Sequence, residues 1–279
     1  MKKLITLFVA LVLALSCAAF AETENKTIVI GATPSPHVEI LEQIVDDMAA
    51  LGYTLEIKTF TDYNLPCAAV ASGDIDANYF AHIPFINSYN ESVSEDEQVT
   101  PVIGVHYEPF GIYSNKYSSI EELPENATVC IPNDASNQSR ALFLLQEAGL
   151  CKLPDGAVPT DTYSINDVVE WTNGLTCSDI DASQTPAVRD DYDIVVINGN
   201  YALDAGLSPL QDAIFYESNE GQSAEIYANY VVVRPADVDA DWVEALRTCL
   251  CSEKIYNYMI DTYAGAVVPY FTIDTEEEE

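Results

Sequence analysis

IPNDASNQSRAL, residues 131–142, carries the clearest structural signal in the chain. It follows the short apolar run Val129–Ile131, which is typical of a buried strand. It then leads through small polar residues into a helical pattern that extends to Ala148. A strand that passes directly into a helix is the repeating unit of α/β proteins. The segment therefore predicts an α/β fold.

The same alternation of strand and helix signals continues on both sides of this segment. Apolar residues recur at helical spacing from Val38 to Met48, and Gly52 is expected to end that helix. A second helix is predicted at Trp242–Tyr263. Strands are predicted at Thr27–Ile30, Thr54–Phe60, Asp193–Ile197 and Tyr230–Val233. This rhythm predicts mostly parallel sheets.

The N-terminus has the pattern of a secretory signal peptide at residues 1–21. Two lysines precede the apolar run Leu4–Leu15, which is too short to span a membrane as a helix. Two kinds of processing remain open. Ala19-Phe20-Ala21 fits cleavage after Ala21 and a soluble exported protein. Ala14-Leu15-Ser16-Cys17 resembles a lipobox, which would place a lipid anchor on Cys17 and hold the protein on the extracytoplasmic face of the cell membrane.

The charge of the chain excludes some partners. The formal net charge is −34, which argues against nucleic acid as a partner because a protein that binds nucleic acid requires a basic surface.

There are seven cysteines, and this odd number fits one lipidated Cys17 and six others. A chain of 279 residues can fold on core burial, so a disulfide framework is not expected.

Two aromatic residues and a histidine gather where a strand is expected to end. Tyr79, Phe80 and His82 follow the turn Gly73–Asp76. Ligands of α/β proteins bind beyond the carboxyl ends of parallel strands, and aromatic rings form a slot for an apolar or thioether side chain. The alternative is that the two rings belong to the core and that His82 is an ordinary surface residue.

Arg140 falls in the expected first turn of the helix after Ile131, where a cation opposes the helix dipole. A bound carboxylate would stabilise it there through two parallel hydrogen bonds. An internal Asp or Glu partner would do the same.

Two asparagines lie next to predicted strands. Asn198 follows the strand Asp193–Ile197 and Asn229 precedes Tyr230–Val233. An Asn amide can accept a hydrogen bond from an ammonium and donate one to a carboxylate.

Signatures of catalysis and of metal binding are not found in the sequence. G-x-S-x-G, H-E-x-x-H and P-loop patterns are absent, and His37, His82 and His106 have no spacing typical of metal ligands. We therefore expect neither an enzyme nor a metal or cofactor site.

The chain resembles the methionine-binding lipoproteins of the NlpA family over nearly all of its mature length. The matching motifs are Gly31–Pro34 with Pro36-His37, Phe60–Tyr63, Gly73–Phe80 with His82, Glu108-Pro109, Ile131–Asp134 with Asn137 and Arg140–Leu142, Ile197–Ala202 and Tyr227–Asn229. The chain departs from the family at Cys67, where Asn is usual, and at Ala81, where Gln is usual.

This resemblance implies a two-lobed periplasmic-binding-protein fold of type II, with two crossover strands and a ligand in the interlobe cleft. It implies that Arg140 and Asn137 hold an amino-acid carboxylate and that Asn198 and Asn229 orient the ammonium and carboxylate. Tyr79, Phe80 and His82 would line a thioether pocket. The expected lobes are residues 27–112 with 228–273, and 113–227, followed by an acidic tail at 274–279.

The function that the resemblance implies is capture of methionine for an ABC importer, made up of a permease and its ATPase. A methionine-containing dipeptide or another apolar amino acid is an alternative ligand. An alternative of another class is a surface lipoprotein without a transport role, and an enzyme built on the same scaffold is a further one because a fold does not fix a function.

Overall fold

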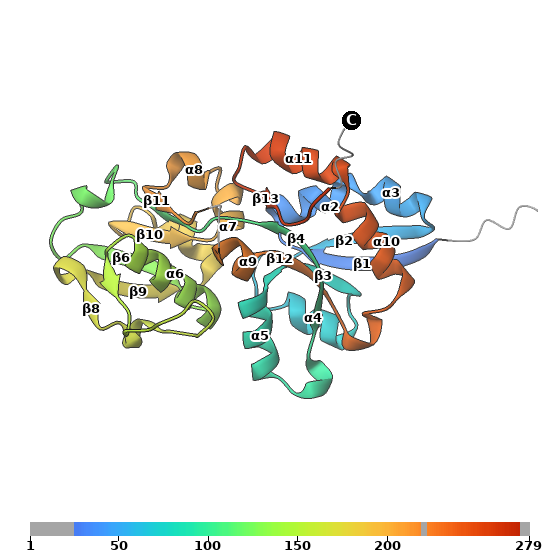
Figure 1. The fold of residues 1–279 in the computed structure, drawn as a ribbon, viewed down its shortest axis with the longest axis horizontal. Coiled ribbons are helices and arrows are strands. Elements are labelled where there is room, and N and C mark those ends of the chain that lie inside the picture. The colour runs from blue at the N-terminus through green and yellow to red at the C-terminus, as the bar shows by residue number, and fades with distance from the viewer. Residues whose placement is uncertain (1–24, 219–221, 274–279) are drawn as a thin grey trace, which may run out of the picture.

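The computed structural model describes residues 25–218 and 222–273. Two β-sheets with flanking helices form two lobes that lie side by side (Figure 1). The predicted signal peptide, Cys17 and the acidic tail at 274–279 lie outside the described residues. Within the described residues, no helix is long and apolar enough to cross a membrane.

The first lobe contains a six-stranded sheet in the order β13-β4-β12-β3-β1-β2. Its strands are β1 (Lys26–Ala32), β2 (Tyr53–Thr59), β3 (Ala77–His82), β4 (Thr100–Tyr107), β12 (Asn229–Val233) and β13 (Val268–Pro269). β1 pairs in parallel with β2 and β3, whereas β12 is antiparallel to both β3 and β4. Most strands therefore run in one direction, as predicted, but the pairing is mixed.

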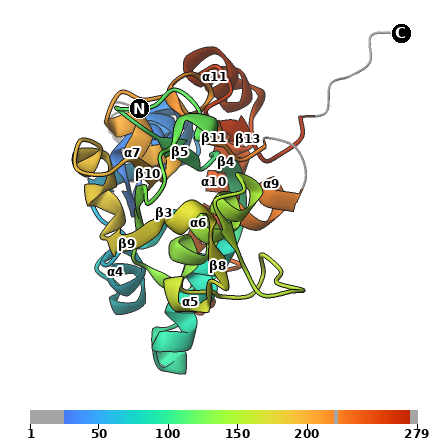
Figure 2. The ribbon, with the colours of Figure 1, turned by 90° about the vertical axis from the view of Figure 1, so that its left-hand side faces the viewer.

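The second lobe, which faces the viewer in Figure 2, contains a five-stranded sheet in the order β11-β5-β10-β6-β9. Its strands are β5 (Gly111–Tyr113), β6 (Thr128–Pro132), β9 (Thr176–Ile180), β10 (Ile194–Ile197) and β11 (Phe215–Tyr216). β6 pairs in parallel with β9 and β10, and β5 is antiparallel to its neighbours. A small separate ribbon joins β7 (Cys151–Lys152) to β8 (Glu170–Trp171).

The chain passes between the lobes twice, and each passage explains one antiparallel strand. The outgoing chain runs from β4 to β5, and the returning chain runs from β11 through α9 (Gln222–Tyr227) to β12. β5 is inserted beside β10 in the second sheet, and β12 is inserted between β3 and β4 in the first. The boundary expected between residues 112 and 113 falls inside β5, which pairs entirely within the second sheet.

Alternation along the strands builds a core on both faces of each sheet. Ile28 and Ile30 face one apolar cluster of the first lobe, and Val29 packs against the other. In the second lobe, Val196 faces one cluster while Val195 faces the other. Successive side chains of a strand point to opposite faces, so continuous apolar runs are what a sheet covered on both sides requires.

The helices cover these faces. They are α2 (Glu39–Gln43), α3 (Val45–Ala50), α4 (Pro66–Ser72), α5 (Ile83–Ser92), α6 (Ala135–Glu147), α7 (Gly199–Asp204), α8 (Pro209–Asp212), α10 (Asp241–Leu250) and α11 (Glu253–Tyr263). In Figure 1, α2, α3, α10 and α11 lie on one side of the first sheet, and α4 and α5 lie on the other.

The helix predicted at Trp242–Tyr263 is in fact two helices. α10 ends at Leu250, and Ser252 begins α11 as a cap whose hydroxyl accepts a hydrogen bond from the Ile255 N–H. The same hydroxyl donates to the carbonyl of Cys249 at 2.8 Å. Ser252 thus satisfies one backbone group of each helix at the break.

We expect Ser252→Ala to lower the free energy of unfolding by about 1 kcal/mol, the usual cost of removing a helix cap. Urea denaturation of the two proteins at pH 7 measures the difference. Ser252→Thr retains the hydroxyl and should stay close to the wild type. An unchanged stability in Ser252→Ala would show that the break does not depend on this cap.

Candidate functional site

A small cavity lies where the two lobes meet. Its walls come from both lobes and from the outgoing crossover. They are formed by Tyr63, Phe80, Ala81, His82, Phe85, Glu108, Asn137, Arg140, Asn198, Gly199, Asn200 and Asn229. β3, β6 and β10 all direct their carboxyl ends towards it, because these strands lead into α5, α6 and α7.

Arg140 lies in the second turn of α6, not in the first, because α6 begins at Ala135 with Asp134 as its cap. Its guanidinium is already paired with an internal carboxylate. Nε donates to Glu217 Oε1 at 2.9 Å, and Nη2 donates to Glu217 Oε2 at 2.5 Å and to the Glu108 carbonyl at 2.8 Å. The internal acidic partner considered from the sequence is therefore present.

Asn137 is the centre of a network that joins the lobes. Its Nδ2 donates to Asp134, and its Oδ1 accepts from Asn198 Nδ2 at 2.9 Å. Oδ1 also accepts from His82 Nε2 at 3.1 Å, across the gap between α6 and β3. Because both ends of the amide are occupied, the structure does not favour the predicted direct contact of Asn137 with a ligand carboxylate. Asn137 instead orients its neighbours.

Two polar atoms in the cavity wall are left without partners. Asn198 Oδ1 and Asn200 Nδ2 are buried and make no hydrogen bond to any described residue. A buried amide without a partner is costly, on the order of 1–3 kcal/mol. One is an acceptor and the other a donor, so the wall presents unmet hydrogen-bonding capacity of both kinds, as a zwitterionic ligand would require.

An aromatic wall closes the other side of the cavity. The rings of Tyr63 and Phe80 stack with centroids 5.4 Å apart, and Phe85 meets Phe80 edge-on at 5.3 Å. The Tyr63 hydroxyl donates to Asn200 Oδ1 at 2.5 Å and so links the lobes. Such a wall suits an apolar side chain, and a thioether in particular.

Tyr79 does not belong to this wall. Its side chain is fully buried in the core cluster of the first lobe, and its hydroxyl binds His106 Nδ1. Tyr79 and Phe80 are successive residues of β3, so they point to opposite faces of the sheet and cannot both line the cavity. The prediction that Tyr79 lines the pocket was therefore wrong.

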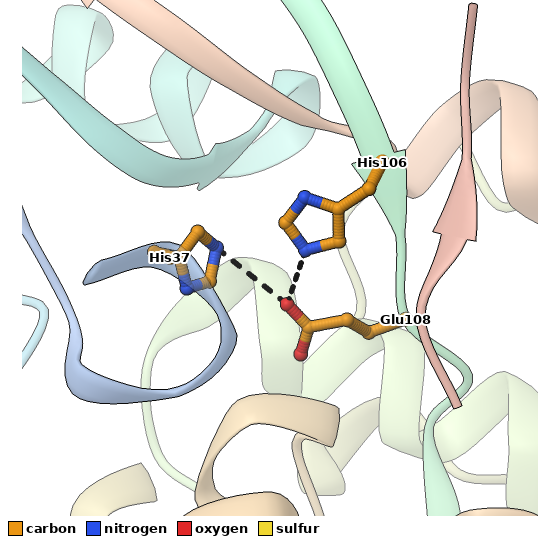
Figure 3. Close-up of side chains that lie close together, drawn as sticks. All are labelled: His37, His106 and Glu108. Carbon is orange, nitrogen blue, oxygen red and sulfur yellow. Dashed lines mark hydrogen bonds and ion pairs between the residues drawn. The ribbon is translucent and has the colours of Figure 1, made fainter. Parts of the chain in front are cut away.

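His37 and His106 form a cluster with Glu108 (Figure 3), and the Glu108 side chain also lines the cavity. Nε2 of His106 lies 2.6 Å from Glu108 Oε1, and Nε2 of His37 lies 3.5 Å from the same oxygen. Burial lowers the pKa of each histidine to about 3, so both rings are neutral at pH 7. Burial raises the pKa of Glu108 to about 7, against the opposing effects of His37 and Arg140.

The structure thus brings together six of the predicted residues, Phe80, His82, Asn137, Arg140, Asn198 and Asn229, around one cavity. Tyr63, Phe85, Glu108 and Asn200 also line it but were not predicted. Tyr63, Glu108 and Asn200 each lie within a motif that carries the family resemblance, which was the available signal. Phe85 lies beyond those motifs, and only the geometry of α5 reveals it.

Two α/β lobes, two crossovers and a cavity at their junction define the periplasmic-binding-protein class. Residues 28–271 match the model of the NlpA lipoprotein family, and the chain belongs to that family. The predicted two-lobed fold and family are thereby confirmed.

Individual relatives agree with this assignment. The chain is 36% identical over 251 residues to the methionine-binding lipoprotein MetQ of Bacillus subtilis, covering 89% of this chain and 90% of that protein. The structure of a nutrient binding protein from Burkholderia cenocepacia bound to methionine has a TM-score of 0.81 at 36% identity, covering 88% and 100%. A periplasmic substrate-binding protein of an ABC transporter from Coxiella burnetii has a TM-score of 0.80 at 29% identity, covering 87% and 99%.

The buried ring of His82 predicts a pH dependence of stability. Nδ1 accepts from the Phe85 N–H at 3.2 Å, and Nε2 faces Asn137. Burial, followed by the charge of Arg140, lowers the pKa of His82 from 6.5 to about 3. Between these values the unfolded chain takes up a proton that the folded chain does not, so the stability contributed by neutral His82 is lost as the pH falls from 6.5.

We expect His82→Gln to lose stability less steeply than the wild type on acidification. The difference between the two free energies of unfolding should change by up to about 1.4 kcal/mol per pH unit below 6.5. Urea denaturation at pH 7, 6 and 5 measures it, with exposed Asn115→Gln as a control that keeps the wild-type slope. Parallel curves for His82→Gln would contradict a neutral buried ring.

Proposed function

We propose that this protein is exported, captures methionine between its lobes and delivers it unchanged to an ABC importer. The observation that carries the proposal is the cavity itself, where an aromatic wall faces a buried acceptor and a buried donor that both lack partners. The methionine-binding relatives that match nearly the whole chain support the choice of ligand.

The polar wall suggests how an amino acid would lie. The Arg140 guanidinium and Nδ2 of Asn200 are donors suited to the carboxylate, and Oδ1 of Asn198 is an acceptor suited to the ammonium. Asn229 adds an amide on the side of the first lobe. The side chain would then extend along Phe80 and Phe85, where a thioether gains roughly 0.3–1.5 kcal/mol from contact with a ring.

The contacts between the lobes support a binding cycle of opening and closing. Tyr63 donates across the cleft to Asn200, and the Ser35 N–H donates to Asp204 at 3.0 Å. These bonds and the Asn137 network are polar, so water can replace them when the lobes separate, although the rings of Tyr63 and Tyr201 also pack across the cleft with centroids 4.9 Å apart. A ligand that contacts both lobes favours the closed form, which the permease would recognise.

Attachment of lipid to Cys17 would keep the closed form close to the importer. The lipobox-like Ala14-Leu15-Ser16-Cys17 supports this attachment, and the relatives named as lipoproteins support it further. Cleavage after Ala21 would instead give a soluble exported protein.

Asn198→Ala should weaken methionine binding by about 10- to 100-fold, because it removes the unpartnered acceptor and one hydrogen bond that orients Asn137. Native mass spectrometry of the protein from residue 25 onwards identifies any ligand that copurifies, and calorimetry with added methionine gives the affinity. Asn115→Ala, which removes an exposed amide of the second lobe, is the matched control.

Each result separates the functions considered above. Copurified methionine supports the proposal. A dipeptide or another amino acid in the cavity would replace the ligand and keep the transport role. A wild-type protein that neither carries methionine nor binds it would overturn the proposal and favour a surface lipoprotein without transport.

A further inference from the structure

The loop at residues 60–65, between β2 and α4, carries a tyrosine that contacts the other lobe. The loop has no helix or strand of its own, and Asp62 shapes it by accepting a hydrogen bond from the Asn64 N–H at 2.8 Å. From this loop, Tyr63 donates to Asn200 Oδ1 at the start of α7. Because the loop belongs to neither sheet, it can move without breaking the hydrogen bonds between strands.

A second tyrosine makes the reverse contact. Tyr201 lies on α7 in the second lobe, and its hydroxyl donates to the carbonyl of Thr61 in the loop at 3.4 Å. The rings of Tyr63 and Tyr201 pack against each other with centroids 4.9 Å apart. Each tyrosine therefore bonds to the segment that carries the other, and a ring contact lies between the two bonds. None of these contacts needs a ligand.

Tyr63 lies between two hollows in the surface of the lobes. One is the ligand cavity, and the other is a second groove, here called the outer groove. Residues of both lobes line the outer groove, among them Asn64, Ser88, Tyr89, Asp134 and Ser136. Tyr63 and Phe85 line both hollows, and their rings meet edge-on at 5.8 Å. These two rings therefore separate the cavity from the outer groove.

The outer groove has the properties of an entrance. Asn64, Ser92 and Ala135 on its walls are exposed to solvent. Most of its other lining side chains carry a hydroxyl, and none of the residues that line it is positively charged. A charged amino acid is costly to remove from water, and such a wall lets it keep its hydration as far as Tyr63. The step past the two rings is then the one that requires the protein to move.

Resting on the proposed function, we propose that Tyr63 and Tyr201 form a gate between the outer groove and the cavity, and that this gate sets the rate at which methionine enters and leaves. Displacement of the loop breaks two hydrogen bonds and one ring contact. It leaves the bond from the Ser35 N–H to Asp204 in place, because that bond involves neither the loop nor the outer groove. Exchange through the gate therefore does not require the lobes to separate fully.

Full separation of the lobes is the competing route for exchange. It would break the Ser35–Asp204 bond and the bond between His82 and Asn137 together with the contacts of the gate. Loss of any contact between the lobes would then speed release by a comparable factor. A gate instead makes the rate sensitive to Tyr201 and to the width of the outer groove.

The test changes Tyr201, which is not among the residues that line the cavity. Exchange of bound isotope-labelled methionine against an excess of unlabelled methionine gives the rate of release, calorimetry gives Kd, and their ratio gives the rate of entry. We expect Tyr201→Leu to speed entry and release by about 10-fold each and to change Kd by less than about threefold. The closed gate loses one hydrogen bond and one ring contact in the free and the bound protein alike. Tyr201→Phe retains the ring and should speed both steps by only about threefold.

A change in the outer groove should have the opposite effect. Ser88→Phe places a ring in the groove and should slow entry and release by at least about threefold each, with an unchanged Kd. Asp204→Asn weakens a bond between the lobes outside the gate and should speed release by a smaller factor than Tyr201→Leu does. Tyr256→Leu is the matched control, because this ring packs on Phe271 in the first lobe, and it should leave both rates unchanged. Thermal melts show that each variant is folded.

Three results would overturn the proposal. Faster release from Tyr201→Leu with a proportionally higher Kd and unchanged entry would mean that Tyr201 only stabilises the bound form. Equal acceleration by Tyr201→Leu and Asp204→Asn, with no effect of Ser88→Phe, would assign exchange to separation of the lobes. A wild type that does not bind methionine would overturn the proposed function itself, and the gate with it.

Discussion

The carboxylate of Glu217 ties together the segments on which the two-lobed arrangement depends. It holds Arg140 of α6 through two hydrogen bonds. Glu217 Oε2 also accepts from the Tyr107 hydroxyl at 2.8 Å and from the Phe110 N–H at 2.9 Å, both on the outgoing chain. Because Glu217 itself lies on the returning chain, one buried group fixes both crossovers and a helix of the second lobe. Removing one partner of a buried ion pair costs about 3–5 kcal/mol, so the junction of the three segments depends on this carboxylate.

The fold could be predicted from sequence because its signals are local. Continuous apolar runs mark the strands, as in Ile194–Ile197, and helical spacing marks the segments between them. The antiparallel insertion of β12 could not be predicted in this way, because pairing with β3 and β4 joins residues more than a hundred positions apart. The break between α10 and α11 was missed since Ser252 reads as an ordinary residue of an amphipathic helix until its hydrogen bonds are known.

The site was predictable as a set of residues but not as a set of roles. Arg140, Asn137 and Tyr79 were all named, yet their partners decide what each one does. Glu217 lies 77 residues from Arg140, and Asn198 lies 61 residues from Asn137. No spacing pattern connects such pairs. Tyr79 was misplaced for a simpler reason, because alternation along β3 sends it to the face opposite Phe80 and neither face was identified beforehand.

The insertion of β12 also has a consequence for how the chain acquires its structure. β12 occupies the place between β3 and β4, so a nascent chain that ends before residue 229 leaves the edges of both strands open. The first lobe therefore cannot complete its sheet until most of the protein has been synthesised. Pairing so distant in sequence makes folding slow, because the entropy of closing a long loop must be overcome before the contacts form. Until β12 is added, β3 and β4 therefore expose backbone N–H and C=O groups that a neighbouring chain could pair with.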